Sequence, residues 1–213
     1  MHIDGAFGLW ANASPRLSSL LAGASQADSW ATDAHKWLNV PYDSGIVIVR
    51  DPQNHLSLKT GRCAYAGPAS LECRDGSQWT PENSRRARGF VLYAALRHLG
   101  RSGVRQLIEN CSDLAGSFAR ELATQPHLRI LNQVVLNQVL FRVEPPSVSD
   151  LDAFNTRLAR RIQQNGVCWM GTTQWHGQTA LRISVSNYAT SLTDVRLSLA
   201  SLFASIQQEL AAS

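Results

Sequence analysis

The chain has 213 residues, a formal net charge of +4, and 44% hydrophobic against 17% charged residues, which is the balance of a packed globular protein. The positive charge comes from eighteen arginines and two lysines, and these form no basic block of the kind that follows nucleic-acid phosphates. The longest apolar stretches, such as GIVIV, fall far short of the roughly 20 residues that cross a bilayer. We therefore expect no nucleic-acid partner and no membrane partner.

The four cysteines are scattered and lack the C-x-x-C spacing of a zinc site. No secretory leader is visible before them, so neither a disulfide framework nor a metal site is expected. We predict reduced thiols and a cytoplasmic location.

The first hundred residues predict short elements around one long irregular stretch. DSWAT (28–32) and GIVIVR (45–50) are β-prone and bounded by Gly, Pro and Asp, so two buried strands should flank a turn. A short helix is expected over residues 14–23. Residues 61–81 show no period, and loops of this length are usually functional or disordered. A helix from Pro81 to Leu99 follows.

The rest of the chain alternates helices and strands. Helices are predicted at 104–122, 150–164 and 193–210, and strands at 128–131, 134–143, 167–170 and 180–186. Ser191 and Asp194 have the spacing of a capping box at the start of the last helix. This pattern predicts a small α+β layer in which helices cover a mostly antiparallel sheet.

Two polar residues, Asp4 and Lys36, follow strand-like segments, where loops carry chemistry on a rigid frame. Lys36 lies among Trp30, Trp37 and Leu38, and such apolar surroundings favour the neutral amine that a Schiff base requires. If the aldehyde is pyridoxal phosphate, a carboxylate such as Asp4 must keep its pyridine nitrogen protonated. A turn or cap aspartate and a solvated lysine are the ordinary alternatives, and spacing alone leaves them open.

Two of these stretches together carry a specific resemblance. HIDGAFG (2–8) followed by DSWATDAHKWLNVPYDSG (28–45) resembles the pyridoxal-phosphate-dependent decarboxylases of the aromatic-L-amino-acid and glutamate decarboxylase group. The similarity continues through WTPENSRRARGFVLYAALRHLGRSG (79–103) and LRISVSN (181–187), so it covers nearly the whole chain.

The resemblance implies an α/β fold of the aspartate-aminotransferase type, known as fold type I. Residues 1–102 would be the C-terminal portion of the large pyridoxal-phosphate domain, and residues 103–213 would form a small α+β domain. Members of the group carry a further few hundred residues before the position of Met1, so a fragment is expected. The complete protein is expected to be a homodimer that decarboxylates an L-amino acid.

The same resemblance assigns roles to individual residues. Lys36 would form the Schiff base, and Asp4 would pair with the pyridinium nitrogen. Ala6 would lie against the cofactor ring and His35 near its phosphate. Tyr65 is the tyrosine of the irregular stretch, and it would return a proton to carbon after carbon dioxide leaves. A surface-packing role for Tyr65 is the alternative.

Arg182 and Asp33 are two further charged residues at positions that matter in this group. Arg182 matches a position near the substrate carboxylate, although a structural ion pair would equally suit a guanidinium there. Asp33 stands where better-known members of the group usually have an asparagine that helps to hold the phosphate. Because a negative charge would repel a phosphate, Asp33 is not expected in the site.

Two other functions stay open at this stage. Asp4 and Lys36 would serve an aminotransferase or a carbon-carbon lyase as well as a decarboxylase. The chain could also be a non-catalytic remnant that acts as an interaction module through its small domain and its arginine-bearing helix. The identity of the amino-acid substrate is not encoded in these motifs.

Overall fold

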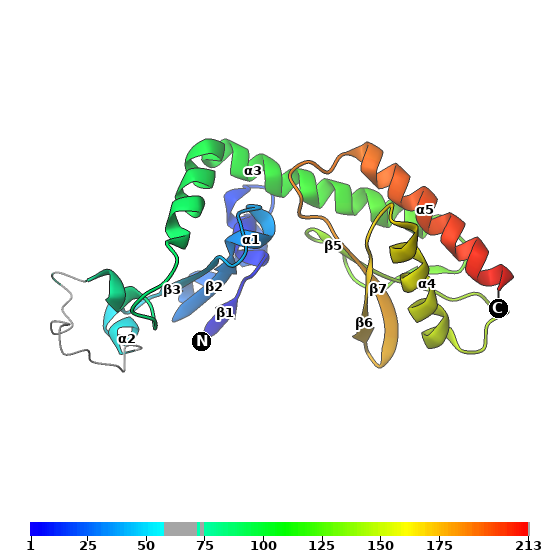
Figure 1. Cartoon of the computed structure of the whole chain (residues 1–213), viewed down its shortest axis with the longest axis horizontal. Coiled ribbons are helices and arrows are strands. Elements are labelled where there is room, and N and C mark those ends of the chain that lie inside the picture. Colours follow the sequence, from blue (N-terminus) through cyan, green and yellow to red (C-terminus); the bar gives the residue numbers. More distant parts are fainter. Residues whose placement is uncertain (58–71, 73–74, 213) are drawn as a thin grey trace. The chain divides into compact units, whose positions relative to one another are not determined.

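The computed structural model describes residues 1–57, 72 and 75–212 (Figure 1). The chain divides into two compact units, Met1–Arg105 and Gln106–Ser213. Within the described residues, no helix combines the length and the apolar character needed to cross a membrane.

The first unit contains a three-stranded sheet in the order β1-β2-β3 (Figure 1). Its strands are β1 (His2–Asp4), β2 (Ser29–Asp33) and β3 (Gly45–Val49). β1 runs parallel to β2, with Asp4 opposite Ala31, and β2 runs antiparallel to β3. The two strands predicted on either side of Lys36 are therefore confirmed, but the expectation that both are buried is wrong for β3, where Val47 is 53% and Ile48 52% exposed.

Among the described residues of the first unit, all helices that precede Arg88 are short. They are the 3-10 helices η1 (Gly8–Ala13), η2 (Ser18–Leu21), η3 (Ala24–Gln26) and η4 (Gly76–Trp79), and the α-helices α1 (Ala34–Trp37) and α2 (Pro52–Leu56). The single helix predicted over residues 14–23 is wrong, because only part of that range is helical and its geometry is 3-10. Gly23 ends this stretch with a φ of +82°, a conformation that glycine adopts without a side-chain clash.

Helix α3 (Arg88–Ala123) is interrupted at Gly100, whose φ of +61° and ψ of −175° lie outside the helical region. The interruption agrees with the two helices predicted on either side of this glycine. The predicted start at Pro81 is wrong, since the helix begins seven residues later, at Arg88. Before that point the Arg86 side chain donates a hydrogen bond to the carbonyl of Tyr42, so this segment is tied to the loop after Lys36.

The second unit is an antiparallel sheet with helices packed on it, as predicted. The strands β4 (Leu128–Ile130), β5 (Gln138–Val143), β6 (Gly171–Trp175) and β7 (Gln178–Ser184) lie in the order β4-β5-β7-β6. Helix α4 (Leu151–Asn165) contacts strands β5, β6 and β7, and α5 (Leu192–Ala211) packs on α4 (Figure 1).

One predicted strand of this unit is misplaced. Residues 167–170 connect α4 to the sheet, and β6 begins only at Gly171. The carbonyl of Met170 accepts a hydrogen bond from the side chain of Gln163 on α4 instead of joining a strand ladder. Met170 is buried while Trp169 is 72% exposed. The apolar run therefore reflects a connection packed against the helix, since such runs do not distinguish strands from other buried segments.

Helix termini of the second unit follow the sequence signals closely. Asp150 accepts a hydrogen bond from the backbone N–H of Ala153 at 2.9 Å and caps α4, which ends at Gly166 with a φ of +70°. Ser191 and Asp194 form the predicted capping box, with the Ser191 backbone N–H donating to the Asp194 carboxylate at 2.8 Å.

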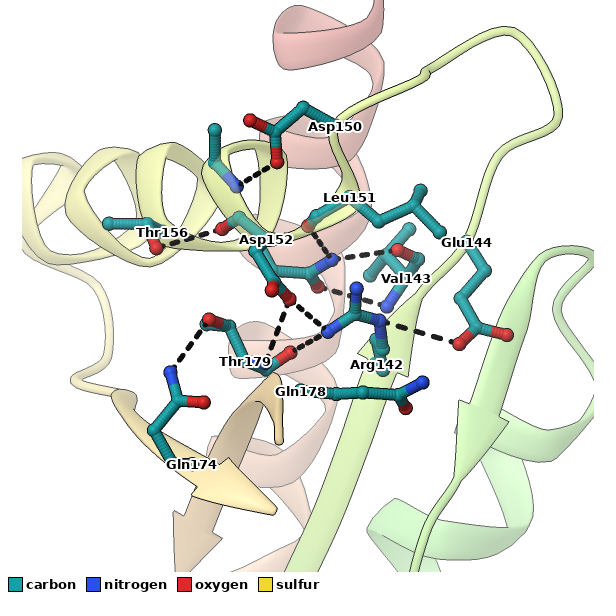
Figure 2. Close-up of polar contacts among 12 residues, drawn as sticks. Arg142, Val143, Glu144, Asp150, Leu151, Asp152, Thr156, Gln174, Gln178 and Thr179 are labelled. Carbon is teal, nitrogen blue, oxygen red and sulfur yellow. Dashed lines mark hydrogen bonds and ion pairs between the residues drawn. The ribbon is translucent and has the colours of Figure 1, made fainter. Parts of the chain in front are cut away.

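A buried arginine connects β5, α4 and β7 in this unit (Figure 2). The Arg142 guanidinium donates to Oδ1 of Asp152 at 2.6 Å and to the carbonyl of Thr179 at 2.5 Å, and its Nε lies 3.4 Å from Oε1 of Glu144. The Thr179 N–H donates to the same Asp152 oxygen at 2.8 Å. This backbone hydrogen bond and that from Arg142 lower the pKa of the Asp152 carboxyl.

Candidate active site

The turn that carries Lys36 is held on both sides. It begins where β2 ends at Asp33 and forms the short helix α1. Ala34 and Trp37, two of the four residues of α1, are fully buried. The backbone N–H of Ala34 donates to the carbonyl of Ser44 at 2.9 Å, which joins the turn to the segment before β3. The lysine backbone is therefore fixed by packing and hydrogen bonds.

The Lys36 side chain itself remains accessible, with 35% of its surface exposed. Its Nζ lies 5.1 Å from the centroid of the Phe7 ring, a distance typical of a cation–π contact. Phe7 in turn packs edge-on against Trp37, with ring centroids 5.7 Å apart. The apolar surroundings expected from sequence are partly present, but a charged partner is also there. Nζ lies 2.8 Å from Oδ2 of Asp33.

Asp4 ends β1, next to the strand that leads to Lys36. The backbone N–H of Ala6 donates to Oδ1 of Asp4 at 3.2 Å. The carbonyl of Ala6 accepts hydrogen bonds from the Thr32 hydroxyl and the Asp33 backbone N–H at 3.5 Å and 3.4 Å. Asp4, Ala6 and Lys36 thus follow the C-terminal ends of two adjacent parallel strands, where ligands bind in open α/β sheets.

His35 is oriented by its neighbours. Its Nδ1 accepts a hydrogen bond from the backbone N–H of Ser44 at 3.1 Å, so the proton of the neutral ring lies on Nε2. Nε2 is 4.0 Å from Oδ2 of Asp33. The imidazole also stacks on Tyr42, with ring centroids 4.0 Å apart and planes inclined by 45°. These contacts leave His35 with a fixed ring plane and one defined donor.

An ion pair that the sequence did not predict joins the lysine turn to α3. Arg88 donates from Nε to Oδ1 of Asp43 at 2.8 Å and from Nη2 to Oδ2 at 2.9 Å. This two-point hydrogen bonding lowers the pKa of the Asp43 carboxyl to about 2. Arg88 lies 45 residues after Asp43, so no local spacing signals the pair. Asp43 directly precedes Ser44, the hydrogen-bond partner of His35.

Two predicted site residues lie outside the described part of the first unit. Tyr65 lies outside the described residues. Arg182 belongs to the second unit, where it lies on β7 opposite Leu140 of β5 and Gly171 of β6 and is exposed. The roles of both residues stay predictions. Within the described residues, no group of His, Cys, Asp and Glu side chains has an arrangement that would hold a metal ion.

Comparison with known proteins decides the family. The model of the pyridoxal-dependent decarboxylase conserved domain matches residues 1–144. The chain belongs to this family. It is 27% identical over 208 residues to an aromatic-L-amino-acid decarboxylase of Bacillus atrophaeus, covering 92% of this chain and 42% of that enzyme. A phenylacetaldehyde synthase of Arabidopsis thaliana is 26% identical over 189 residues, which cover 86% of this chain and 39% of the synthase.

Solved structures of family members share the fold. Tryptophan decarboxylase of Catharanthus roseus, crystallised with L-tryptophan, superposes with a TM-score of 0.85 at 24% identity and covers 98% of this chain and 44% of that one. Oryza sativa TDC with PLP and tryptamine gives a TM-score of 0.87 at 22% identity, with coverages of 97% and 44%. The prediction of part of a fold type I enzyme is confirmed. The chain spans about two fifths of the length of these relatives.

Proposed function

We propose that the protein to which this chain contributes is a pyridoxal-phosphate-dependent decarboxylase of L-amino acids. The observation that carries the proposal is the position of an accessible lysine and an exposed aspartate after the C-terminal ends of adjacent parallel strands. The family match over residues 1–144 includes both of them. We further propose that the complete protein is a cytoplasmic homodimer.

The residues present fit the proposed cofactor. Lys36 offers a primary amine on a rigid turn with room around it, because more than a third of the side chain is exposed. The Asp4 carboxylate receives one hydrogen bond from Ala6, and its second oxygen has no donor among the described residues. That oxygen would hold a proton on a pyridine nitrogen. Pyridoxal phosphate, when bound, supplies an electron sink for the carbon that loses carbon dioxide.

The other proposed residues would hold the cofactor or the substrate, or transfer a proton. His35, with its proton on Nε2, would donate a hydrogen bond to a phosphate oxygen or to another acceptor above α1. Ala6 would lie beside the cofactor ring. Tyr65 would deliver a proton to the substrate carbon, and Arg182 would hold the substrate carboxylate.

The relatives favour decarboxylation but include a second reaction. Their names cover aromatic amino-acid, tyrosine and tryptophan decarboxylases, an aspartate 1-decarboxylase, and phenylacetaldehyde synthases. An aldehyde-forming reaction at the same site is therefore the second candidate, and Tyr65 separates the two. In a decarboxylase, Tyr65→Phe should stop amine release and divert the reaction toward oxidative or transaminating products. The substrate class stays open between aromatic and acidic amino acids.

The first experiment asks whether Lys36 binds the cofactor. The chain is incubated with pyridoxal phosphate, followed by absorbance at about 420 nm, reduced with borohydride and mapped by peptide mass spectrometry. Because the chain has only two lysines, Lys36 and Lys59, the label has two possible sites. We expect it on Lys36 and expect Lys36→Ala to remove it. Label on Lys59 alone, or no label, would contradict the assignment and favour a non-catalytic interaction module.

A further inference from the structure

The ion pair between Asp33 and Lys36 is the closest charged contact of the proposed Schiff-base lysine. The Asp33 carboxylate lies 2.8 Å from Nζ, and only 25% of its side chain is exposed. The two residues are three positions apart at the start of α1, a spacing that brings oppositely charged side chains together. The negative charge of Asp33 would repel a phosphate, but the structure places it against a cation.

The Asp33 side chain does not cap helix α1. The residue stands at the N-cap of α1, yet its side chain accepts no capping hydrogen bond from that helix. The N–H of Ala34 is bonded instead to the carbonyl of Ser44. The carboxylate is directed at the two cationic or protonatable side chains of the turn, with Lys36 at 2.8 Å and Nε2 of His35 at 4.0 Å.

We infer that Asp33 is a positioning residue that holds the Lys36 ammonium as its counter-ion while no aldehyde is bound. This inference rests on the proposed function for its biological meaning, because it assigns to Asp33 the control of cofactor capture. Nζ must leave the Asp33 carboxylate, 2.8 Å away, before it can attack an aldehyde carbon. Asp33 therefore slows the reaction of Lys36 with aldehydes and keeps Nζ in place until the cofactor enters.

Formation of the Schiff base at Lys36 needs only the aldehyde and water. The ammonium of Lys36 gives one proton to water, and the neutral nitrogen attacks the aldehyde carbon. A carbon–nitrogen double bond forms as the aldehyde oxygen leaves as water. Borohydride, added as the trapping reagent, supplies hydride to the carbon of that double bond and makes the attachment permanent.

A competing explanation gives Asp33 an effect on phosphate alone. If its charge merely repels the phosphate of the cofactor, then neutralising it would help pyridoxal phosphate and leave phosphate-free pyridoxal unaffected. If Asp33 acts on Lys36, neutralising it speeds the reaction with both aldehydes. The pair of reagents therefore separates an effect on the lysine from an effect on the ligand.

The experiment measures the initial rate of borohydride-trapped labelling of Lys36, relative to Lys59 in the same sample, with pyridoxal and with pyridoxal phosphate at neutral pH. The unmodified chain is compared with Asp33→Asn. Asp51→Asn serves as a matched control, because it makes the same charge change at the N-cap of α2. For Asp33→Asn we expect the Lys36 rate to rise about two- to fivefold with both aldehydes, the range expected for a partly exposed ion pair. Asp51→Asn should leave it unchanged.

A second measurement covers the case in which Asp33→Asn disturbs the fold. In the unmodified chain, raising the salt from low to about 1 M screens partly exposed ion pairs, so labelling of Lys36 with pyridoxal should rise relative to Lys59. An unchanged or reduced Lys36 rate in both measurements would overturn the inference, since a purely structural role predicts no acceleration. Acceleration with pyridoxal phosphate alone would overturn it in favour of phosphate repulsion.

The comparison of pyridoxal phosphate with pyridoxal tests the proposed function independently of Asp33. If pyridoxal phosphate labels Lys36 no better than pyridoxal in any variant, the chain has no phosphate-dependent capture, and the proposed cofactor site fails. The acceleration by Asp33→Asn in the pyridoxal samples would still stand, because it reports only the contact between Asp33 and Lys36.

Discussion

Arg142 in the second unit and Lys36 in the first are both cations paired with an aspartate, but their surroundings differ. The Arg142 side chain is 5% exposed and is held by Asp152, Glu144 and the carbonyl of Thr179 (Figure 2). The Lys36 side chain is 35% exposed and has one carboxylate partner. A cation enclosed by several acceptors has a structural role. A cation with one partner and solvent around it can separate from that partner and react. The difference separates a structural charge from a reactive one.

The energetics of the two pairs differ for the same reason. Removing one partner of a buried pair leaves uncompensated charges and polar groups away from water, which costs several kcal/mol. A partly exposed pair gains little, because water and salt solvate either charge when it is alone. The contrast therefore predicts a large effect for loss of Arg142, a smaller one for protonation of its carboxylate partners, and the smallest for loss of Lys36.

The largest effect is expected for Arg142→Ala. The substitution leaves the buried Thr179 carbonyl without its side-chain donor and the Asp152 carboxylate without its cation, while Glu144 keeps its ion pair with Arg129. The free energy of unfolding of the second unit should therefore fall by about 3–4 kcal/mol. Urea denaturation, with hydrogen exchange of residues 138–184 as the local probe, measures it. Arg160→Ala, an exposed position on α4, is the control and should cost less than about 0.5 kcal/mol. Equal losses in both variants would show that the buried network contributes no more to stability than an exposed arginine.

An intermediate effect is expected on acidification. Hydrogen bonding by Arg129 lowers the pKa of the Glu144 carboxyl, and bonding by Thr179 and Arg142 lowers the pKa of Asp152. A carboxyl whose pKa is lowered by folding stabilises the folded state above its unfolded value and loses this contribution as the pH falls through the folded value. Stability of the second unit should therefore be level above about pH 5 and decline below about pH 4.

This pH profile can be checked against a variant. In Asp152→Asn the decline on acidification should be shallower, because one of the carboxyls with a lowered pKa is absent. Urea midpoints measured between neutral and acidic pH give the profile. A decline as steep as in the unmodified chain would place the acid sensitivity elsewhere.

The smallest effect is expected for Lys36→Ala. The Asp33 carboxylate that is left behind is partly solvated, so the free energy of unfolding should change by less than about 1 kcal/mol, although all labelling at residue 36 is lost. Circular dichroism during urea denaturation measures the first quantity. A loss as large as that of Arg142→Ala would mean that Lys36 belongs to the framework, and the contrast between the two cations would fail.

Much of the second unit could be predicted from local patterns. The amphipathic period predicted α4 and α5, and Ser191 and Asp194 marked the start of α5 because capping chemistry involves residues within one turn. The pattern failed at residues 167–170, where an apolar run belongs to a buried connection. Its bonding partner, Gln163, lies on a helix, and no periodicity reports such a contact.

The residues of the candidate site could be predicted from the sequence, but not the contacts between them. The motifs around Asp4 and Lys36 predicted the family and the residues that would hold the cofactor. They did not predict that Asp33 faces Lys36, or that Asp43 pairs with Arg88. The charge of Asp33 predicts repulsion of a phosphate, whereas its partner in the structure is a neighbouring side chain. The Asp43–Arg88 pair joins positions that become neighbours only after the chain has folded.

The sequence by itself determined the family, the strands on either side of Lys36, the antiparallel sheet of the second unit and its helix caps. These features depend on periodicity, capping and motif residues that interact over a few positions along the chain. Only the tertiary structure decided which carboxylate faces the lysine, which ring nitrogen of His35 carries the proton, and which arginine is enclosed. Those outcomes depend on distances and burial between side chains from separate elements, and burial sets the free energy of a charge more strongly than its residue type.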